Sequence, residues 1–364
     1  MTATATRVRA AGRHAVPNPT LASAFHPRHN ALNLIRLLLA TNVAVVHACF
    51  LGFGHQPHLG ETELGALAVD AFFVLSGFLV VRSWSRLGSL PRYLWHRVLR
   101  ILPGFWVCML GTAFVVAPVL AVLEGRAAGS VFSGPQSSLS YLASNAALFM
   151  RQFGIAGLPG EGGNPDVVNG SLWTLFYEAC CYLLVAGLGV AGLLGRRRRV
   201  VPVLIVVLWF CTVAAEAGHN PLGSTYMLRF GLVFLLGAAG WLFAGRIPVD
   251  GRLALGSAVV VLASTLMLHD YRALGAPAFA YLCLYAVVRL PVPWEPRSDL
   301  SYGMYVWHWP IAQILVALGL ARFTHVPFVL LTLALTAGVA VVSWRFVEKP
   351  ALGLKNAFGG VRRG

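Results

Sequence analysis

An apolar run over residues 32–53, LNLIRLLLATNVAVVHACFLGF, carries two ionisable side chains and limits the folds open to this chain. A helix of about 20 residues, rising about 1.5 Å per residue, crosses the hydrocarbon core of a bilayer, so the run predicts a transmembrane helix. Arg36 and His47 lie inside it, eleven positions apart. Eleven steps of about 100° return a helix to nearly the same face. We therefore expect both side chains to point to one side, separated along the axis by roughly 16 Å.

Two interpretations of this pair are open. Charged groups inside lipid are costly, and those that are present usually line a protein interior or a water-filled cavity. In the structural interpretation, Arg36 extends to the cytoplasmic surface and His47 is a hydrogen-bonded packing residue. Two ionisable side chains on one helix face favour a functional site. We take this helix as the element around which the other spans are arranged.

The composition extends the membrane prediction to the whole chain. Hydrophobic residues make up 57% of the 364 residues and charged residues 11%, and the mean hydropathy is +0.71. A soluble protein carries about 25% charged residues, so these values indicate a multi-span membrane protein. The net charge of +15 does not indicate a nucleic-acid-binding protein, because the arginines lie in short links between apolar runs.

Ten apolar runs predict an all-α integral membrane protein whose transmembrane domain covers residues 30–352. With the N-terminus in the cytoplasm, the links placed inside are rich in arginine, as in the run Arg196–Arg199, and the links placed outside carry few. This asymmetry follows the positive-inside rule and predicts that both termini are cytoplasmic. The predicted spans are 32–53, 64–81, 101–123, 170–194, 200–217, 225–244, 253–269, 273–290, 300–320 and 326–347.

Four segments outside the spans have a distinct character. Residues 1–29 are polar and contain proline and arginine, which predicts a disordered cytoplasmic tail, and residues 353–364 form a C-terminal cytoplasmic tail. Residues 82–100 mix arginine with tryptophan and tyrosine, which indicates an amphipathic cytoplasmic interface helix near 91–100. Residues 124–169, the longest outside link, are rich in glycine and proline and could cover the outer mouth of a cavity.

Acidic side chains are rare within the spans, and each one needs a partner. A carboxylate in hydrocarbon costs several kcal/mol unless it is paired or protonated. Such a residue either holds helices together or belongs to a functional site. Both interpretations are open for Asp70, whereas the mid-span position of Glu178 favours function, and Glu216 lies at a span end. The expected partners are the basic groups Arg36, His47, Arg229 and His308.

Basic side chains near the cytoplasmic ends of the spans are candidates for phosphate binding. Arg97 and Arg100 are neighbours on one helix face, where two guanidinium groups suit a phosphate; the alternative is anchoring to anionic lipid. His308 lies in an aromatic cluster, where a structural role is favoured over a catalytic one. The histidines and glutamates of the first outside link have no helical pattern to fix their geometry, so we predict no metal site.

Several motifs occur together in one order. They are R-x10-H in the first span, VDAFFVLSGFL in the second, R-x-x-R followed by ILP, WTLFYEACCY in the fourth, SYGMYVWHWP, and a closing FVEKP. This ordered set resembles the acyltransferase-3 family of bacterial integral membrane acyltransferases over about residues 30–352. The sequence departs from the family at Asn33, where many members have an aspartate three residues before the motif arginine.

The resemblance implies a ten-span O-acyltransferase of the bacterial plasma membrane. Family members move an acetyl or other short acyl group from cytoplasmic acyl-CoA to a hydroxyl of a sugar, an envelope polysaccharide, a glycolipid or a macrolide-type natural product. At the matching positions, His47 becomes the catalytic residue and Arg36 its motif partner. Arg97 and Arg100 become cations that contact CoA. The resemblance is to the stand-alone transmembrane form, without the C-terminal hydrolase-like domain of many members.

A mechanism for these residues follows as a hypothesis. Histidine suits general base catalysis near neutral pH, so His47 would take the proton of the acceptor hydroxyl while its oxygen attacks the thioester carbonyl. Arg36 would hold a CoA phosphate or stabilise the oxyanion. Glu178 or Asp70, which match acidic positions of the family, would orient the imidazole. Direct transfer and an acyl-histidine intermediate are both open.

A solute transporter or flippase is the alternative function. Ten spans with charges near the midplane also suit a solute carrier. Many transporters are built from paired halves, however, and no internal repeat is visible in this sequence. The acyltransferase hypothesis is therefore preferred, and it predicts acyl-CoA, a carbohydrate or glycosylated acceptor, and membrane lipids as partners, without nucleic acid or a metal.

Overall fold

Helices dominate the structure. The computed structural model describes residues 19–27, 29–160, 162–219, 223–292, 298–322 and 324–357, and it is 72% helical, which confirms the predicted helical class. Each of the ten predicted spans overlaps a helix. These helices are α2 (Leu32–Phe53), α3 (Leu64–Leu87), α4 (Leu90–Gly111) with α5 (Ala117–Leu123), α7 (Thr174–Val190), α8 (Val200–Glu216), α9 (Thr225–Leu242), α10 (Gly251–Met267), α11 (Arg272–Arg289), α12 (Ser301–Ala317) and α13 (His325–Ser343).

Short elements join and extend these helices. A π-helical turn, η1 (Thr112–Val116), links α4 to α5, and a second one, η4 (Trp344–Glu348), links α13 to α14 (Lys349–Gly353). Because the helix continues through both turns, each pair forms one long helical segment. The remaining elements are α1 (Leu21–Ala24), the hairpin of β1 (His58–Leu59) and β2 (Thr62–Glu63), η2 (Ala128–Phe132), α6 (Ser138–Asn145), η3 (Leu320–Arg322) and η5 (Leu354–Asn356).

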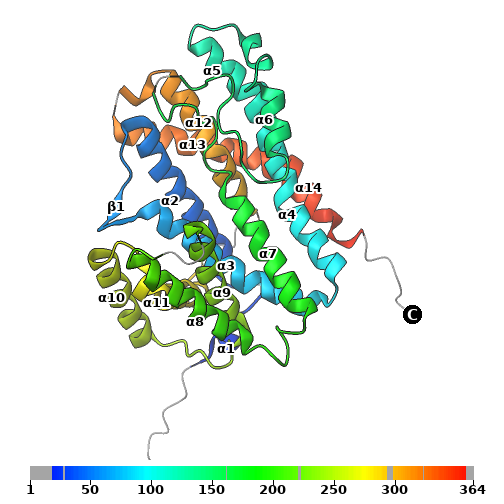
Figure 1. Ribbon diagram of the computed structural model, residues 1–364, viewed down its shortest axis with the longest axis vertical. Helices are drawn as coiled ribbons and strands as arrows, with labels where there is room; N and C mark the ends of the chain where they lie inside the picture. The colour runs from blue at the N-terminus through cyan, green and yellow to red at the C-terminus, as the bar shows by residue number, and fades with distance from the viewer. Residues whose placement is uncertain are drawn as a thin grey trace, which may run out of the picture.

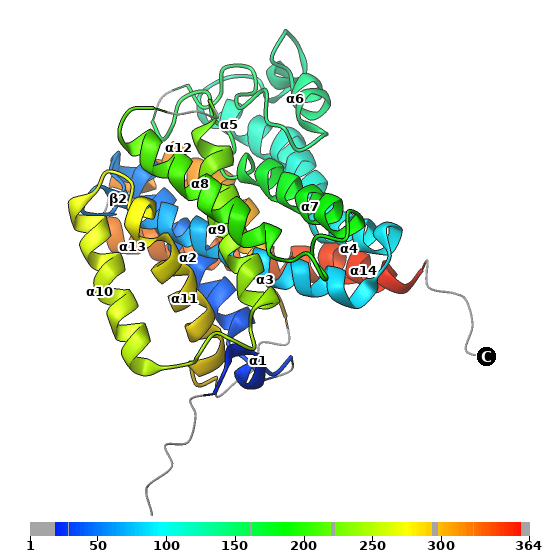
Figure 2. The ribbon, with the colours of Figure 1, turned by 60° about the horizontal axis from the view of Figure 1, so that its bottom comes forward.

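Long, mutually tilted helices form the body of the molecule. The α5 and α6 helices lie at one end of the longest axis, and α8, α10 and α11 lie toward the other (Figure 1). In the turned view, α10 and α11 lie side by side at one edge, with α4 and α14 together at the opposite edge (Figure 2). The first span, α2, packs against α3, α12 and α13, but less of it is buried than of α3 or α9, so it is not the most central helix.

Apolar side chains face outward as well as inward. Five helical segments of the described residues are long and apolar enough to cross a membrane, and the segment over 90–123 is one of them. On α8 and α10, Val203, Phe210, Leu255 and Val259 each expose 59% or more of their surface. A soluble protein seldom exposes large apolar side chains along whole helix faces, so these faces have the character of a lipid-contacting surface.

The α3 and α9 helices cross at very short range. A Cβ atom added to Gly77 would lie 2.0 Å from the Phe234 carbonyl oxygen, and one added to Gly237 would lie 1.9 Å from that of Val74. Glycine at both positions therefore lets the two backbones touch. Close approach through small residues is a principal means of helix association in membranes, where water does not drive apolar packing.

The predicted cytoplasmic interface helix near 91–100 is not a separate element. Residues 82–87 complete α3, and α4 begins at Leu90 and runs without a break into the next predicted span. The prediction of a helix here is correct, but the prediction that this helix is separate from the next span is wrong. Nothing between Arg100 and Ile101 interrupts the backbone hydrogen bonds, and the helix also accommodates Pro103.

Both predicted tails are shorter than the sequence indicates. Residues 1–18 and 358–364 lie outside the described residues, but residues 19–27 contain α1 and pack on the bundle. Leu21 is buried, and the Phe25 and Phe78 rings meet edge to face with centroids 5.1 Å apart. The predicted disorder through residue 29 is therefore wrong for 19–27, because these apolar side chains find a docking place. At the other end, the indole of Trp95 donates to the Leu354 carbonyl at 2.9 Å.

Candidate active site

Two histidines from distant parts of the chain meet inside the bundle. His47 of α2 and His308 of α12 lie with Nδ1 of the first 2.7 Å from Nε2 of the second. Their rings stack with centroids 5.0 Å apart and an interplanar angle of 14°. His308 is fully buried, and its Nδ1 lies 3.1 Å from the Met304 carbonyl oxygen.

The partners of this pair assign the tautomer of each neutral ring. A carbonyl oxygen only accepts, so Nδ1 of His308 carries the proton and its Nε2 is an acceptor. Nδ1 of His47 must then donate to that acceptor, which leaves the lone pair on Nε2 of His47. Among the described residues, no hydrogen bond engages this Nε2 atom. The arrangement therefore presents a histidine with an oriented ring and an unoccupied basic nitrogen.

A large cavity lined by cations lies at one end of the bundle. Its volume is about 610 Å³, and it is bounded by the C-terminal part of α3, the N-terminal part of α4, and residues from α2, α7 and the C-terminal segment. Two carboxylates, Glu178 and Asp299, also line it. We call it the inner cavity. Its cationic side chains are Arg36, Arg82, Arg86, Arg97, Arg100 and Lys355.

One carboxylate oxygen bridges two of these cations. Oδ2 of Asp299 accepts from Nη1 of Arg36 at 2.6 Å and from Nη2 of Arg100 at 2.8 Å, while Oδ1 accepts from the Ser301 hydroxyl. Burial by itself raises the pKa of the Asp299 carboxyl, but the Arg100 and Arg36 guanidiniums lower it by more, so this pKa lies well below its ordinary value. The bridge is therefore ionic, and it holds the two guanidinium groups around a single anionic oxygen.

Arg97 also presents hydrogen-bond donors at this cavity. Its Nη2 donates to the Ser83 hydroxyl at 3.3 Å, and its guanidinium lies over the Tyr182 ring, 5.3 Å from the centroid. Its Nε atom is buried and has no hydrogen-bond partner among the described residues. A buried unpaired donor costs free energy that an incoming acceptor would recover. Arg97 and Arg100 thus share one cavity, as the R-x-x-R spacing predicts.

A narrow cavity of about 50 Å³ extends the inner cavity toward the histidine pair. Arg36, Ser76 and Glu178 line both cavities, and Tyr305 lines the narrow one. The Tyr305 ring contacts the His308 ring edge to face, with centroids 6.1 Å apart. The narrow cavity therefore ends at Tyr305, whose ring separates it from His308. Glu178 accepts hydrogen bonds from the Ser76 and Tyr182 hydroxyls.

A third cavity, of about 520 Å³, lies on the opposite side of the pair. Aromatic side chains from α7, α9, α12 and the link over 124–169 line it, and we call it the outer cavity. One of them, Trp309, meets the His47 ring edge to face with centroids 4.8 Å apart. Five residues of the link over 124–169 form part of the wall of this cavity, and the prediction that the link covers its mouth stays a prediction. The five residues are Phe149, Met150, Phe153, Asn164 and Val167.

The sequence matches the family described as "Acyltransferase domain" over residues 29–347. The chain belongs to the acyltransferase-3 family. It is similar to the O-acetyl transferase of Shigella phage Sf6, with 26% identity over 88% of this chain and 96% of that protein. No solved structure matches the chain.

Two further relatives are similar over most of their length. Nodulation protein 10 of Rhizobium leguminosarum bv. viciae is 26% identical over 90% of this chain and 94% of the relative. The exopolysaccharide production protein ExoZ of Rhizobium meliloti (strain 1021) is 28% identical over 79% of this chain and 90% of the relative. Together with the apolar helices, membership of the family makes this chain a membrane O-acyltransferase.

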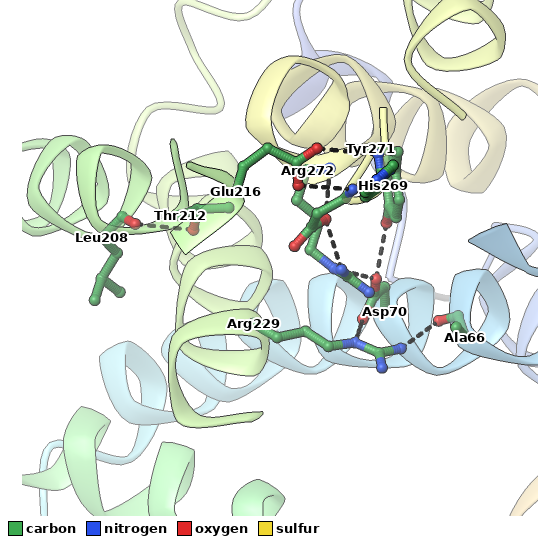
Figure 3. A network of polar contacts seen from close by, with 10 residues as sticks. Ala66, Asp70, Leu208, Thr212, Glu216, Arg229, His269, Tyr271 and Arg272 are labelled. Atoms are coloured by element: carbon green, nitrogen blue, oxygen red, sulfur yellow. Dashed lines mark hydrogen bonds and ion pairs between the residues drawn. The ribbon is translucent and has the colours of Figure 1, made fainter. Parts of the chain in front are cut away.

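Asp70 does not line any of the three cavities described above. Its carboxylate is fully buried and accepts from Nε of Arg229 and from Nε of Arg272, each at 2.8 Å, and from the Tyr271 hydroxyl at 2.9 Å (Figure 3). The network joins α3, α9 and α11. Glu216 extends it from α8, because its two oxygens accept the backbone amides of residues 269 and 270. Arg229 is one of the four basic groups that the sequence predicts as partners of the acidic residues, whereas Arg272 is an additional one.

Replacing Asp70 by asparagine is expected to destabilise the fold. Asp70→Asn leaves the Arg229 and Arg272 guanidiniums without their shared counter-charge, and breaking a buried ion pair costs about 3–5 kcal/mol of the free energy of unfolding. We expect a clear drop in the temperature of thermal inactivation in detergent, with Glu61→Gln in the exposed hairpin turn as the control. Loss of activity in a variant of unchanged thermal stability would instead place Asp70 in the chemistry.

The structure adds residues that the motifs alone leave unassigned. Glu178 and Arg36 line the inner cavity, but the contact at Nδ1 of His47 comes from His308, where the sequence analysis expects a carboxylate. From the sequence we favour a structural role for His308, and that interpretation does not predict its contact with His47. Asp299 is not among the predicted acidic residues, because it lies in the link before a span. The available signal was the unusual density of ionisable and aromatic residues between Asp299 and Trp309.

Proposed function

We propose that the protein transfers an acetyl or other short acyl group from cytoplasmic acyl-CoA to a hydroxyl of an envelope carbohydrate or glycosylated compound. One observation carries the proposal: the His47 and His308 pair contacts both Tyr305, in the narrow extension of a cationic cavity, and Trp309, in the lining of an aromatic cavity. A donor with several phosphates suits the first, and an acceptor suits the second. In this arrangement the acyl group crosses the membrane only as far as the imidazoles.

The proposed orientation places the inner cavity in the cytoplasm. Ten spans with both termini inside agree with the arginine distribution, and the inner cavity is formed by the arginine-rich ends of α3 and α4 with the C-terminal segment. The aromatic outer cavity then faces the extracytoplasmic side of the plasma membrane. This supports an enzyme that takes its donor from one side and its acceptor from the other.

Acyl-CoA suits the inner cavity on charge and shape. Six cationic side chains face two carboxylates there, so the cavity has an excess of positive charge for the diphosphate and the 3′-phosphate of CoA. Arg36, Arg97 and Arg100 present guanidinium forks, which bind phosphate in two-point geometry. The narrow cavity that leads to Tyr305 suits the thin pantetheine arm and would direct the thioester toward the histidine pair.

His47 is the proposed general base. Its Nε2 lone pair is available in the tautomer that the hydrogen bonds assign, and it would take the proton of the acceptor hydroxyl as the oxygen attacks the thioester carbonyl. The C–S bond of the tetrahedral intermediate then breaks, and the proton held on His47 passes to the CoA sulfur, so CoA leaves as the thiol and the imidazole is neutral again. His308 would orient the ring and, through its Nε2 acceptor, stabilise the imidazolium that forms, which is the part an aspartate takes in other triads. Glu178 would act on the donor side, through Ser76 and Tyr182.

The relatives support a carbohydrate acceptor. One relative is named for O-acetyl transfer and another for exopolysaccharide production, and both match most of this chain. A polysaccharide, glycolipid or glycosylated product presents many hydroxyls on a rigid ring, and a positioned base can select one of them. We therefore favour transfer to a sugar hydroxyl over transfer to water.

Transfer from labelled acetyl-CoA tests this function. Inside-out membrane vesicles from a producing strain, and from the same strain carrying the empty vector, would be incubated with acetyl-CoA labelled in the acetyl group. We expect CoA release and base-labile label in the carbohydrate fraction that depend on the protein. If neither acetyl-, propionyl- nor butyryl-CoA were consumed above the vector level, the proposed donor would be wrong.

A further inference from the structure

The outer cavity reaches the histidine pair through one side chain, Trp309. Trp309 lines the cavity and also contacts His47, while Tyr305, one turn earlier on α12, lines the narrow cavity on the other side. His308 lies between these two residues on the same helix. At the start of α7 the same division recurs, because Trp173 lines the outer cavity and Thr174 lines the narrow one. The two cavities therefore come close to each other at Trp173 and Thr174, and on α12 each has a lining residue in contact with one of the imidazoles.

We infer that the outer cavity is the acceptor site and that it binds an uncharged sugar ring. This inference rests on the proposed function and names the site and the class of its second substrate. Among the described residues that line the cavity, none carries a charged side chain. A uronic or sialic acid would lose hydration there with no charged lining side chain to pair with; Arg151 lies over the Phe149 ring, 5.8 Å from its centroid, but is not part of the lining. A neutral ring loses only hydrogen bonds that amide, hydroxyl and indole groups can replace.

The aromatic lining has the geometry of a stacking surface. Trp173 and Tyr226 lie with ring centroids 4.5 Å apart, and Tyr177 lies 5.6 Å from Trp173 and 5.9 Å from Tyr226. Flat aromatic faces give a sugar ring an apolar surface for its C–H groups, and tyrosine hydroxyls supply hydrogen bonds at the edge. Tyr226 exposes 46% of its surface, so the cluster is open to an incoming ring.

The wall of the cavity next to the base is fixed by hydrogen bonds and close packing. The Trp309 indole donates to the Val167 carbonyl at 3.2 Å, and the Gln313 amide donates to the same oxygen at 2.9 Å. A Cβ atom at Gly170 would lie 2.6 Å from the Trp309 ring, so only glycine allows the link to lie against it. The indole is thereby held against His47, and a ring bound in the cavity would place a hydroxyl beside the base.

The test separates the acceptor side from the donor side. Trp173→Ala and Tyr226→Ala are expected to lower acetyl transfer to carbohydrate in the vesicle assay at least tenfold, while the Kd for acetyl-CoA of the purified protein stays within twofold of wild type. Trp173→Phe, which keeps an aromatic face, should retain most of the transfer. Phe210→Ala on the exposed face of α8 is the matched control and should transfer like wild type.

Analysis of the product tests the charge of the acceptor. Mass spectrometry of the hydrolysed carbohydrate fraction is expected to find the acetyl ester on hexose or N-acetylhexosamine residues. Transfer at the wild-type rate by both alanine variants, an equal loss of acetyl-CoA binding in both, or an ester confined to uronic or sialic acids would each overturn the inference. If the wild-type protein consumes no acyl-CoA, the proposed function itself fails, which is a distinct result.

Discussion

Replacing His47 by alanine is expected to lower acetyl transfer about 10³-fold and to leave the Kd for acetyl-CoA within twofold of wild type. General base catalysis contributes about 10² to 10⁴-fold, and Nε2 of His47 is the basic nitrogen that the hydrogen-bond pattern leaves available. Donor binding should persist, because the inner cavity is formed by other residues. The two quantities are measured by the vesicle transfer assay and by equilibrium binding of labelled acetyl-CoA to the purified protein.

Variants of His308 show whether the pair acts as a unit. His308→Ala removes the acceptor of the His47 Nδ1 proton and should lower transfer by about 10² or more, whereas His308→Gln, whose amide oxygen can accept that proton, should keep part of it. His325→Ala, an exposed histidine that stacks on Phe53, is the control and should be neutral. Wild-type transfer in His47→Ala would show that another group takes the proton.

The local part of this site was predictable from the sequence. Helix periodicity fixes which side chains share a face, so the spacing of Arg36 and His47 predicts that both point to one side; in the structure, Arg36 meets Asp299 and His47 meets His308. The R-x-x-R spacing correctly predicts that Arg97 and Arg100 lie together. Each of these predictions needs only the geometry of one helix.

The contacts between helices were not predictable in the same way. His308 is 261 residues from His47, and Asp299 is 263 residues from Arg36. The packing of the whole bundle decides which faces of α2 and α12 meet. A membrane helix is apolar on nearly all sides, so its sequence hardly distinguishes the face that contacts another helix from the face that contacts lipid. The prediction that the helix near 91–100 is separate from the next span was wrong for a related reason. Composition indicates where a helix meets the membrane interface, but only a break in backbone hydrogen bonding would separate that helix from the span that follows.

Removing Arg100 is expected to weaken acetyl-CoA binding strongly. Arg100→Ala removes one of the two guanidinium groups that Asp299 bridges. A hydrogen bond to a charged group contributes about 1.5–3 kcal/mol to the free energy of binding. Its loss corresponds to an increase of at least about tenfold in Kd. The difference between wild type and variant should narrow at high salt, because charged contacts near solvent are screened. Arg252→Ala, an exposed arginine on α10, is the control for charge alone and should bind like wild type.

Asp299→Asn should change the same Kd in the opposite direction. The carboxylate occupies the position between Arg36 and Arg100 that a phosphate oxygen of the donor would take, so it competes with the donor for these two cations. Asparagine keeps a carbonyl oxygen of similar size there but removes the charge. We therefore expect acetyl-CoA to bind more tightly to Asp299→Asn and less tightly to Arg100→Ala, in equilibrium binding at one ionic strength. If both variants bound acetyl-CoA more weakly, Asp299 would serve to hold the arginines in place, and the donor phosphates would bind beside the bridge without replacing it.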